Sequence, residues 1–186
     1  MAEQVMIKGQ SFKSFFTAFE KLYGESKARE LKQQLPPEIG QAIANGTVLP
    51  SGWYAVAWYR ALHTAAKVVI GDASLADKIG TETTRADLSG IYSSFAKLLS
   101  PKNLLRVLSV LFGTYTKGGS LKVQQTGERM LTLYFHYGEP IGMDMWNEIA
   151  AACRTMLVLG GEKNVASRWV SGATDLATDS NLEVTY

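Results

Sequence analysis

The chain has 186 residues, of which 46% are hydrophobic and 19% are charged, and its formal net charge is +2. This length and composition are those of an ordinary globular protein, so we expect a single domain over residues 1–186. A net charge so close to zero argues against a nucleic-acid partner and against binding to an anionic membrane surface.

Few residues of the chain are of the kinds that bind metals or form disulfides. Cys153 is the only cysteine, so it cannot form an intrachain disulfide, and with two histidines it cannot complete a zinc site of nitrogen and sulfur ligands. Charged side chains interrupt every apolar stretch before it reaches the roughly 20 residues that cross a bilayer, and no signal-peptide pattern precedes the first helix. We therefore expect a cytoplasmic protein with no metal and no membrane contact.

Apolar residues recur at every third or fourth position in the first two-thirds of the chain, which predicts amphipathic helices. After a short opening segment, residues 4–8, the expected helices cover about residues 12–23, 25–34, 37–44, 53–70, 73–99 and 101–117. Ser11 is the expected cap of the first helix, and Gly24 is expected to end it. The polar run Gly80–Thr84 has weak helix propensity, so we expect a kink or break there.

The spacing of apolar residues changes to every second position near residue 118. Leu121–Gln125 and Leu131–His136 alternate in this way around a short turn, which predicts an antiparallel hairpin. A last helix from about Ile141 to Leu159 and two strands, about Asn164–Val170 and Asn181–Tyr186, follow. The sequence predicts an α+β fold, in which a helical N-terminal two-thirds packs on a small antiparallel sheet with the order strand-strand-helix-strand-strand. We expect a helical subdomain over about 1–118 and a sheet subdomain over about 119–186.

The residues that usually perform acid-base or nucleophilic chemistry stand in no catalytic motif. His63, on a predicted buried helix, is interpreted as a hydrogen-bonded core residue, with pocket lining as the alternative, and His136 as a surface or cross-strand residue. Cys153 falls on the apolar face of its helix, where a thiol is inert. The acids of the helices show no paired spacing suited to catalysis; they include Asp72, Glu82, Asp87, Asp144 and Glu148. We therefore expect no enzymatic activity.

Aromatic residues are concentrated in the middle of the chain, where rings with polar tips could line a ligand pocket. The candidate pocket residues are Trp53, Tyr54, Trp58, Tyr59, His63, Tyr92, Phe95, Phe112 and Tyr115. The same spacing also describes a solid hydrophobic core, and spacing alone favours the core. The sequence therefore leaves a pocket and a filled core as alternatives.

Three short segments and the late strand-strand-helix-strand-strand block resemble a known family. The segments are Leu49-Pro50-Ser51-Gly52-Trp53-Tyr54, Leu75-Ala76-Asp77-Lys78-Ile79-Gly80 and Pro101-Lys102-Asn103-Leu104-Leu105. From about Phe12 onward the chain resembles an uncharacterised family of myxobacterial paralogous proteins. That family is distantly similar to the vinyl-reductase-like small-molecule-binding domain of aromatic-effector-sensing transcriptional activators, and to the heme nitric-oxide sensor fold.

The resemblance implies a ligand-binding or sensory module with a cavity between the helical part and the sheet. Heme sensors of this fold carry a helical proximal histidine and a Tyr-x-Ser-x-Arg motif, whereas Tyr92-Ser93-Ser94 is followed by Phe95-Ala96. We therefore expect no cofactor, with heme as the alternative. The expected ligand is a small hydrophobic or aromatic molecule, and the expected protein partner is a second copy of the chain or a signalling protein. A homo-oligomeric interaction or scaffold protein without a ligand is the alternative function.

Overall fold

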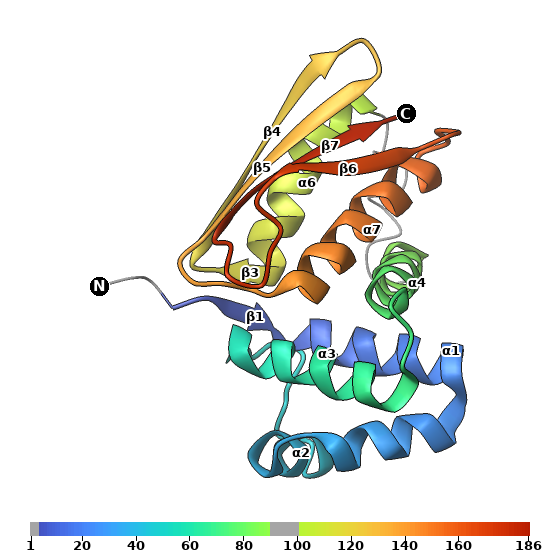
Figure 1. Ribbon diagram of the computed structural model, residues 1–186, viewed down its shortest axis with the longest axis vertical. Coiled ribbons are helices and arrows are strands. Elements are labelled where there is room, and N and C mark those ends of the chain that lie inside the picture. The colour runs from blue at the N-terminus through green and yellow to red at the C-terminus, as the bar shows by residue number, and fades with distance from the viewer. Residues whose placement is uncertain (1–3, 90–100) are drawn as a thin grey trace.

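The computed structural model describes residues 4–89 and 101–186 and is drawn in Figure 1. Helices from the first part of the chain form a layer at one end of the molecule, and a four-stranded antiparallel sheet with its own helices forms the other. The element order places helices first and a strand-strand-helix-strand-strand block last, so the predicted α+β class is confirmed.

Three helices build the N-terminal layer. They are α1 (Gly9–Gln34), α2 (Pro37–Ala44) and α3 (Val56–Ile70). Gly24 interrupts α1 with φ 84° and ψ 163°, a conformation that glycine adopts without the steric cost of a Cβ. The predicted break at Gly24 is therefore confirmed, and it bends α1 into two helical segments.

The start of α1 differs from the prediction that Ser11 caps it. The helix begins at Gly9, and no side chain caps it. Its first amide groups donate instead to carbonyls of the loop before α3: Gly9 N to Gly52 O at 2.9 Å, and Gln10 N to Pro50 O at 3.0 Å. Because these carbonyls satisfy the free amide groups of the first turn, the hydroxyl of Ser11 is not needed as a cap.

The four-stranded sheet consists of β4 (Gly119–Gly127), β5 (Met130–Tyr137), β6 (Ala166–Ser171) and β7 (Asp179–Thr185), in the order β4-β5-β7-β6. The predicted hairpin is the β4–β5 pair, and α7 (Met143–Leu159) connects β5 to β6. At the centre of the sheet, Leu133 of β5 lies opposite Leu182 of β7, and both side chains are fully buried. The alternating apolar residues of these strands therefore face the core, as the sequence predicts.

A second sheet was not predicted from the sequence. It consists of β1 (Met6–Lys8), β2 (Trp53–Ala55) and β3 (Thr116–Lys117), in the order β2-β1-β3. The prediction that Trp53–Ala55 begins the third long helix is wrong, because these residues pair with β1 and the helix starts at Val56. Strands of two or three residues are too short to show an alternating pattern.

The predicted kink at Gly80–Thr84 is also wrong. α4 (Leu75–Ser89) is one continuous helix through these residues, and its predicted extension to residue 99 lies outside the described residues. Gly80 serves another purpose: a Cβ placed there would lie 2.4 Å from the carbonyl oxygen of Glu148 and 3.0 Å from the Ala151 Cβ. The absence of a side chain lets α4 and α7 approach closely.

The core is continuous between the two layers. Its largest fully buried side chains include Phe12, Phe15 and Phe19 of α1, Tyr137 of β5 and Trp146 of α7. α6 (Pro101–Tyr115) contributes Leu108 and Leu111 and contacts β4. Within residues 4–89 and 101–186, no helix has the length and apolar character that a bilayer span requires.

We predict that Gly80→Ala destabilises the protein. A Cβ so close to a backbone carbonyl forces α4 and α7 apart, and overpacking of this kind costs about 1–3 kcal/mol. Thermal unfolding should therefore show a lower midpoint for Gly80→Ala than for the unsubstituted protein.

Gly113→Ala is the matched control, because it lies in α6 with no atom within 4 Å of the added Cβ. It should raise the unfolding free energy by up to about 1 kcal/mol through helix propensity alone. Equal stability of the two variants would contradict the close approach at Gly80.

Candidate functional site

A cavity of about 200 Å³ lies where the two layers meet. Residues of α1, α3, α4, α6 and α7 and of strands β1, β3, β4 and β5 line it. Most of its walls are apolar; they include Leu108, Leu111, Phe112, Phe135, Ile149 and Met156. An apolar cavity with a few polar groups is the usual form of a small-molecule site.

Asp87 brings a carboxylate from α4 to the cavity. The hydroxyl of Ser14 on α1 donates to its Oδ1 at 2.8 Å, and the hydroxyl of Tyr115 on α6 donates to its Oδ2 at 2.7 Å. All three residues line the cavity. Two neutral hydroxyls from two different helices therefore fix the orientation of this carboxylate.

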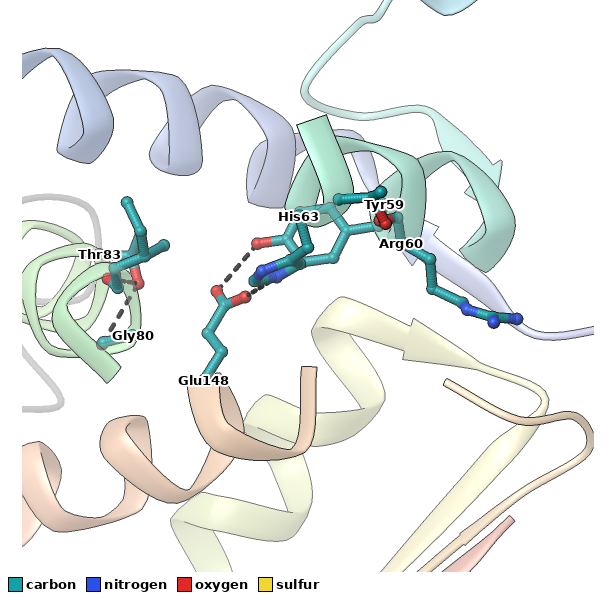
Figure 2. Close-up of polar contacts among 8 residues, drawn as sticks. Tyr59, Arg60, His63, Gly80, Thr83 and Glu148 are labelled. Atoms are coloured by element: carbon teal, nitrogen blue, oxygen red, sulfur yellow. Dashed lines mark hydrogen bonds and ion pairs between the residues drawn. The ribbon is translucent and has the colours of Figure 1, made fainter. Parts of the chain in front are cut away.

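Glu148 brings a second carboxylate to the cavity from α7. Figure 2 shows its side chain extending toward Tyr59 and His63 of α3. The Tyr59 hydroxyl donates to Oε1 at 2.9 Å, and His63 Nε2 donates to Oε2 at 2.6 Å. Tyr59 is 4% exposed and His63 is 2% exposed, so this link between α7 and α3 is buried on the α3 side.

The other ring nitrogen of His63 determines how the ring is protonated in this arrangement. Nδ1 is buried and has no hydrogen-bond partner among the described residues. A neutral ring that donates from Nε2 leaves Nδ1 as an unpaired acceptor, whereas a second ring proton would bury an unpaired N–H donor next to the core. Nε2 therefore carries the proton that His63 donates to Glu148, and Nδ1 is left without a partner among the described residues.

Burial keeps the other titratable groups of the cavity in their neutral forms. It raises the pKa of Tyr59 well above the ordinary value, and the nearby Glu148 carboxylate adds to the effect. Burial also raises the pKa of Tyr137, and that of the Cys153 thiol to about 12. The Tyr59 hydroxyl therefore acts as a hydrogen-bond donor, and burial opposes formation of the reactive thiolate at Cys153, in keeping with its predicted place in the core.

The structure brings only some of the predicted aromatic residues to the cavity. Tyr59, Phe112 and Tyr115 line it, while His63 lies behind Glu148. The predicted interpretation of His63 as a hydrogen-bonded core residue is confirmed. Tyr92 and Phe95 lie outside the described residues.

The remaining predicted pocket residues lie around β2 and do not line this cavity. The ring of Trp53 has the ammonium groups of Lys8 and Lys117 each at 4.5 Å from its centre. Tyr54 stacks on Trp58 with ring centres 5.7 Å apart, and its hydroxyl donates to Thr47 O at 3.0 Å. These contacts hold the second sheet against the loop between α2 and β2.

His136 has the cross-strand role that the sequence predicts. Its Nδ1 lies 2.8 Å from Asp179 Oδ1, across the β5–β7 pair and on the exposed surface. The Asp179 carboxyl has a lowered pKa, chiefly because of this hydrogen bond. His136 does not line the cavity, although its neighbours Phe135 and Tyr137 do, because successive side chains of a strand point to opposite faces of the sheet.

Asp87 and Glu148 are not among the pocket residues predicted from the sequence. Both stand at core-facing positions of amphipathic helices: Asp87 is four residues after the buried Thr83, and Glu148 is three residues after the buried Met145. An acid on the apolar face of a helix is the signal that could have found them, because charged residues are rarely placed there without a reason.

We predict that alkaline conditions destabilise the protein. Tyr59, Tyr137 and Cys153 keep their protons in the folded state above the pH at which an unfolded chain releases them. Their stabilising contribution is complete below about pH 9 and is lost as pH rises above it, by at most about 1.4 kcal/mol per pH unit for each group. Urea unfolding at steps between about pH 7 and pH 11 measures this loss.

Cys153→Ala should make the fall in stability shallower between about pH 9 and pH 10, where the thiol is the first of the three groups to contribute. An unchanged slope would contradict a buried neutral thiol at this position.

Comparisons with known proteins give a likeness of fold. No family model and no curated protein matches the sequence. Among solved structures, an unliganded Fe(II) H-NOX protein mutant from K. algicida has a TM-score of 0.69 at 12% identity, covering 96% of this chain and 96% of that chain.

Two further structures agree with this match. An oxygen-binding H-NOX domain related to soluble guanylate cyclases has a TM-score of 0.67 at 11% identity, covering 96% of this chain and 93% of that chain. A protein studied for the modulation of heme redox potential by porphyrin distortion has a TM-score of 0.68 at 11% identity, covering 97% of this chain and 100% of that chain. The chain therefore shares the fold of H-NOX domains over nearly its whole length, as the resemblance to the heme nitric-oxide sensor fold implies.

Proposed function

We propose that the chain is a sensory or ligand-binding module that holds one small, largely apolar molecule in the cavity between its two layers. The cavity itself carries the proposal: about 200 Å³ of space with mostly apolar walls and a few fixed polar groups. An apolar cavity of about 150 Å³ is large enough for benzene, so this one accommodates a molecule with a single substituted ring.

The position of the cavity supports a sensory role. A ligand there would touch α1 and α3 of one layer and α6, α7 and β5 of the other. Binding would therefore favour one arrangement of the layers over others, which is how a ligand shifts a conformational equilibrium. The output would pass to a second copy of the chain or to a signalling partner, and this step rests on the resemblance to effector-sensing domains.

Heme, which the H-NOX structures suggest as a ligand, does not fit the donor set of this cavity. His136 is exposed on β5, and His63 uses Nε2 to bind Glu148 and does not line the cavity. Burial keeps Tyr59, Tyr137 and the Cys153 thiol protonated, whereas iron prefers the deprotonated forms of such ligands.

The charges of the cavity also oppose heme. Among the described residues, its lining includes Asp87 and Glu148 but no lysine, arginine or histidine. Heme carries two propionate groups, which these carboxylates would repel and no cation would neutralise. A cavity of about 200 Å³ is also small for a ring of four pyrroles.

We predict that the purified protein does not form a stoichiometric heme complex. After incubation with excess hemin and gel filtration, the protein fraction should show no Soret absorption beyond that of the same elution volume from a protein-free hemin sample run in parallel. A one-to-one Soret band that His63→Ala shifts or removes would overturn the assignment of a heme-free cavity.

The test of the proposed function is a search for a bound small molecule. Native mass spectrometry of protein purified from its own host should show an adduct that denaturation releases. In addition, the isotope-labelled protein is titrated with three single-ring probes. They are benzyl alcohol, benzylamine and benzoate, which are neutral, positively charged and negatively charged at neutral pH. At least one of them should shift the NMR signals of cavity residues such as Ile149 and Leu111.

We predict that Ala152→Leu, which fills part of the cavity, weakens the binding of any such molecule at least about tenfold and stabilises the empty protein by about 1–2 kcal/mol. Ala86→Leu is the matched control, because Ala86 lies on the exposed surface of α4. The absence of both an adduct and a probe response would overturn the proposed function and favour the interaction-protein alternative.

A further inference from the structure

We propose that the ligand of the cavity is a cation: a small organic amine whose ammonium group binds Asp87 and Glu148 while its apolar body fills the rest of the space. This inference rests on the proposed function and specifies its ligand class.

The first observation is an unbalanced negative charge in the cavity. Asp87 and Glu148 both line it, and the described lining contains no lysine, arginine or histidine. Asp87 receives only the uncharged hydroxyls of Ser14 and Tyr115, and Glu148 receives the Tyr59 hydroxyl and Nε2 of His63. A carboxylate withdrawn from water is costly unless a positive charge balances it.

The second observation is a contrast with the other acids on the same two helices. On α4, Asp77 is paired with Arg154 and Glu82 with Lys21; on α7, Asp144 is paired with Lys67. Each of these acids lies outside the cavity lining and has a lysine or arginine partner. The two acids that face the cavity have no such partner among the described residues. The acids outside the cavity are therefore paired with cations of the protein, whereas Asp87 and Glu148 are available to a positively charged ligand.

The third observation is the nature of the remaining walls. Rings of Tyr59, Phe112, Phe135 and Tyr137 surround the cavity, and the electron-rich face of an aromatic ring attracts an ammonium group. An ammonium also has three N–H donors, so it can bond to more than one carboxylate oxygen. Aromatic walls and carboxylates together suit an amine better than a neutral hydrocarbon, which would leave the carboxylates without a new partner.

A metal ion is a poorer match for the same charge. Among the described residues, no three histidine, cysteine, aspartate or glutamate side chains come together in a group that could hold a metal. A metal ion would also leave the apolar part of the cavity empty. An organic ammonium uses both parts of the site.

The experiment compares the three single-ring probes by NMR titration of the folded protein. Benzylamine, benzyl alcohol and benzoate have nearly the same shape and differ in charge, so the ratio of their dissociation constants isolates the charge preference. We expect benzylamine to bind at least about tenfold more tightly than benzyl alcohol, and benzoate to bind most weakly. The preference should shrink as salt is added.

The variant Asp87→Asn should reduce the preference for benzylamine over benzyl alcohol several-fold, since it removes a charge and keeps the shape. Asp144→Asn is the matched control, because it removes a charge from α7 outside the cavity and should leave the ratio unchanged. The ratio measured on the unsubstituted protein tests the inference even if a variant folds poorly.

The outcomes separate this inference from the proposed function. Equal or tighter binding of benzyl alcohol or benzoate overturns the amine assignment and leaves a ligand-binding cavity. An Asp87→Asn ratio equal to that of the unsubstituted protein overturns the role of the carboxylate. The absence of binding by all three probes overturns the amine assignment, and it overturns the proposed function as well only when the protein from its own host also carries no adduct.

Discussion

The buried link from Glu148 to Tyr59 and His63 fixes how the two layers of the molecule sit against each other. Both donors are almost fully buried, so removing the carboxylate would leave two polar groups without a partner, at a cost of about 1–3 kcal/mol each. Hydrogen bonds are directional, unlike apolar contacts, so this link sets the position of α7 against α3 as well as stabilising it. The close approach of α4 to α7 at Gly80 then places α4 relative to both.

The cavity at this joint does not collapse because its polar side chains are held by hydrogen bonds to neighbouring helices. Away from the cavity the core is filled by large side chains such as Phe15 and Phe19, whose ring centres lie 6.2 Å apart. Around the cavity the helices also carry small or polar residues, including Thr84 and Ala152, among its apolar walls. Closing the space would require Asp87 to leave the hydroxyls of Ser14 and Tyr115, and the hydrogen bonds lost would oppose the collapse that usually shrinks an apolar void.

The sequence predicts those features whose causes are local. The bend at Gly24 and the β4–β5 hairpin depend on glycine conformation and on residue spacing, and both are confirmed. The uninterrupted α4 depends on its packing against α7, where Gly80 removes a clash, so propensity alone gave the wrong result. The pairing of Trp53–Ala55 with β1 and the convergence of Asp87 and Glu148 arise from tertiary contacts, which one sequence does not reveal. Tertiary contacts also decide where the predicted aromatic residues lie. Tyr59, Phe112 and Tyr115 line the cavity, whereas Trp53, Tyr54 and Trp58 pack around β2.

The likeness to H-NOX structures concerns the fold, and it does not by itself assign a ligand to this chain. A fold sets where the layers meet, whereas the side chains at the joint decide what can bind there. In this chain the joint presents two carboxylates from α4 and α7 and protonated tyrosines from α3 and β5. That set repels the acidic groups of a heme and lacks an available histidine. Under our proposal, the same set supplies the acceptors and aromatic walls for an amine, so the side chains at the joint, and not the arrangement of helices and strands, would select the ligand.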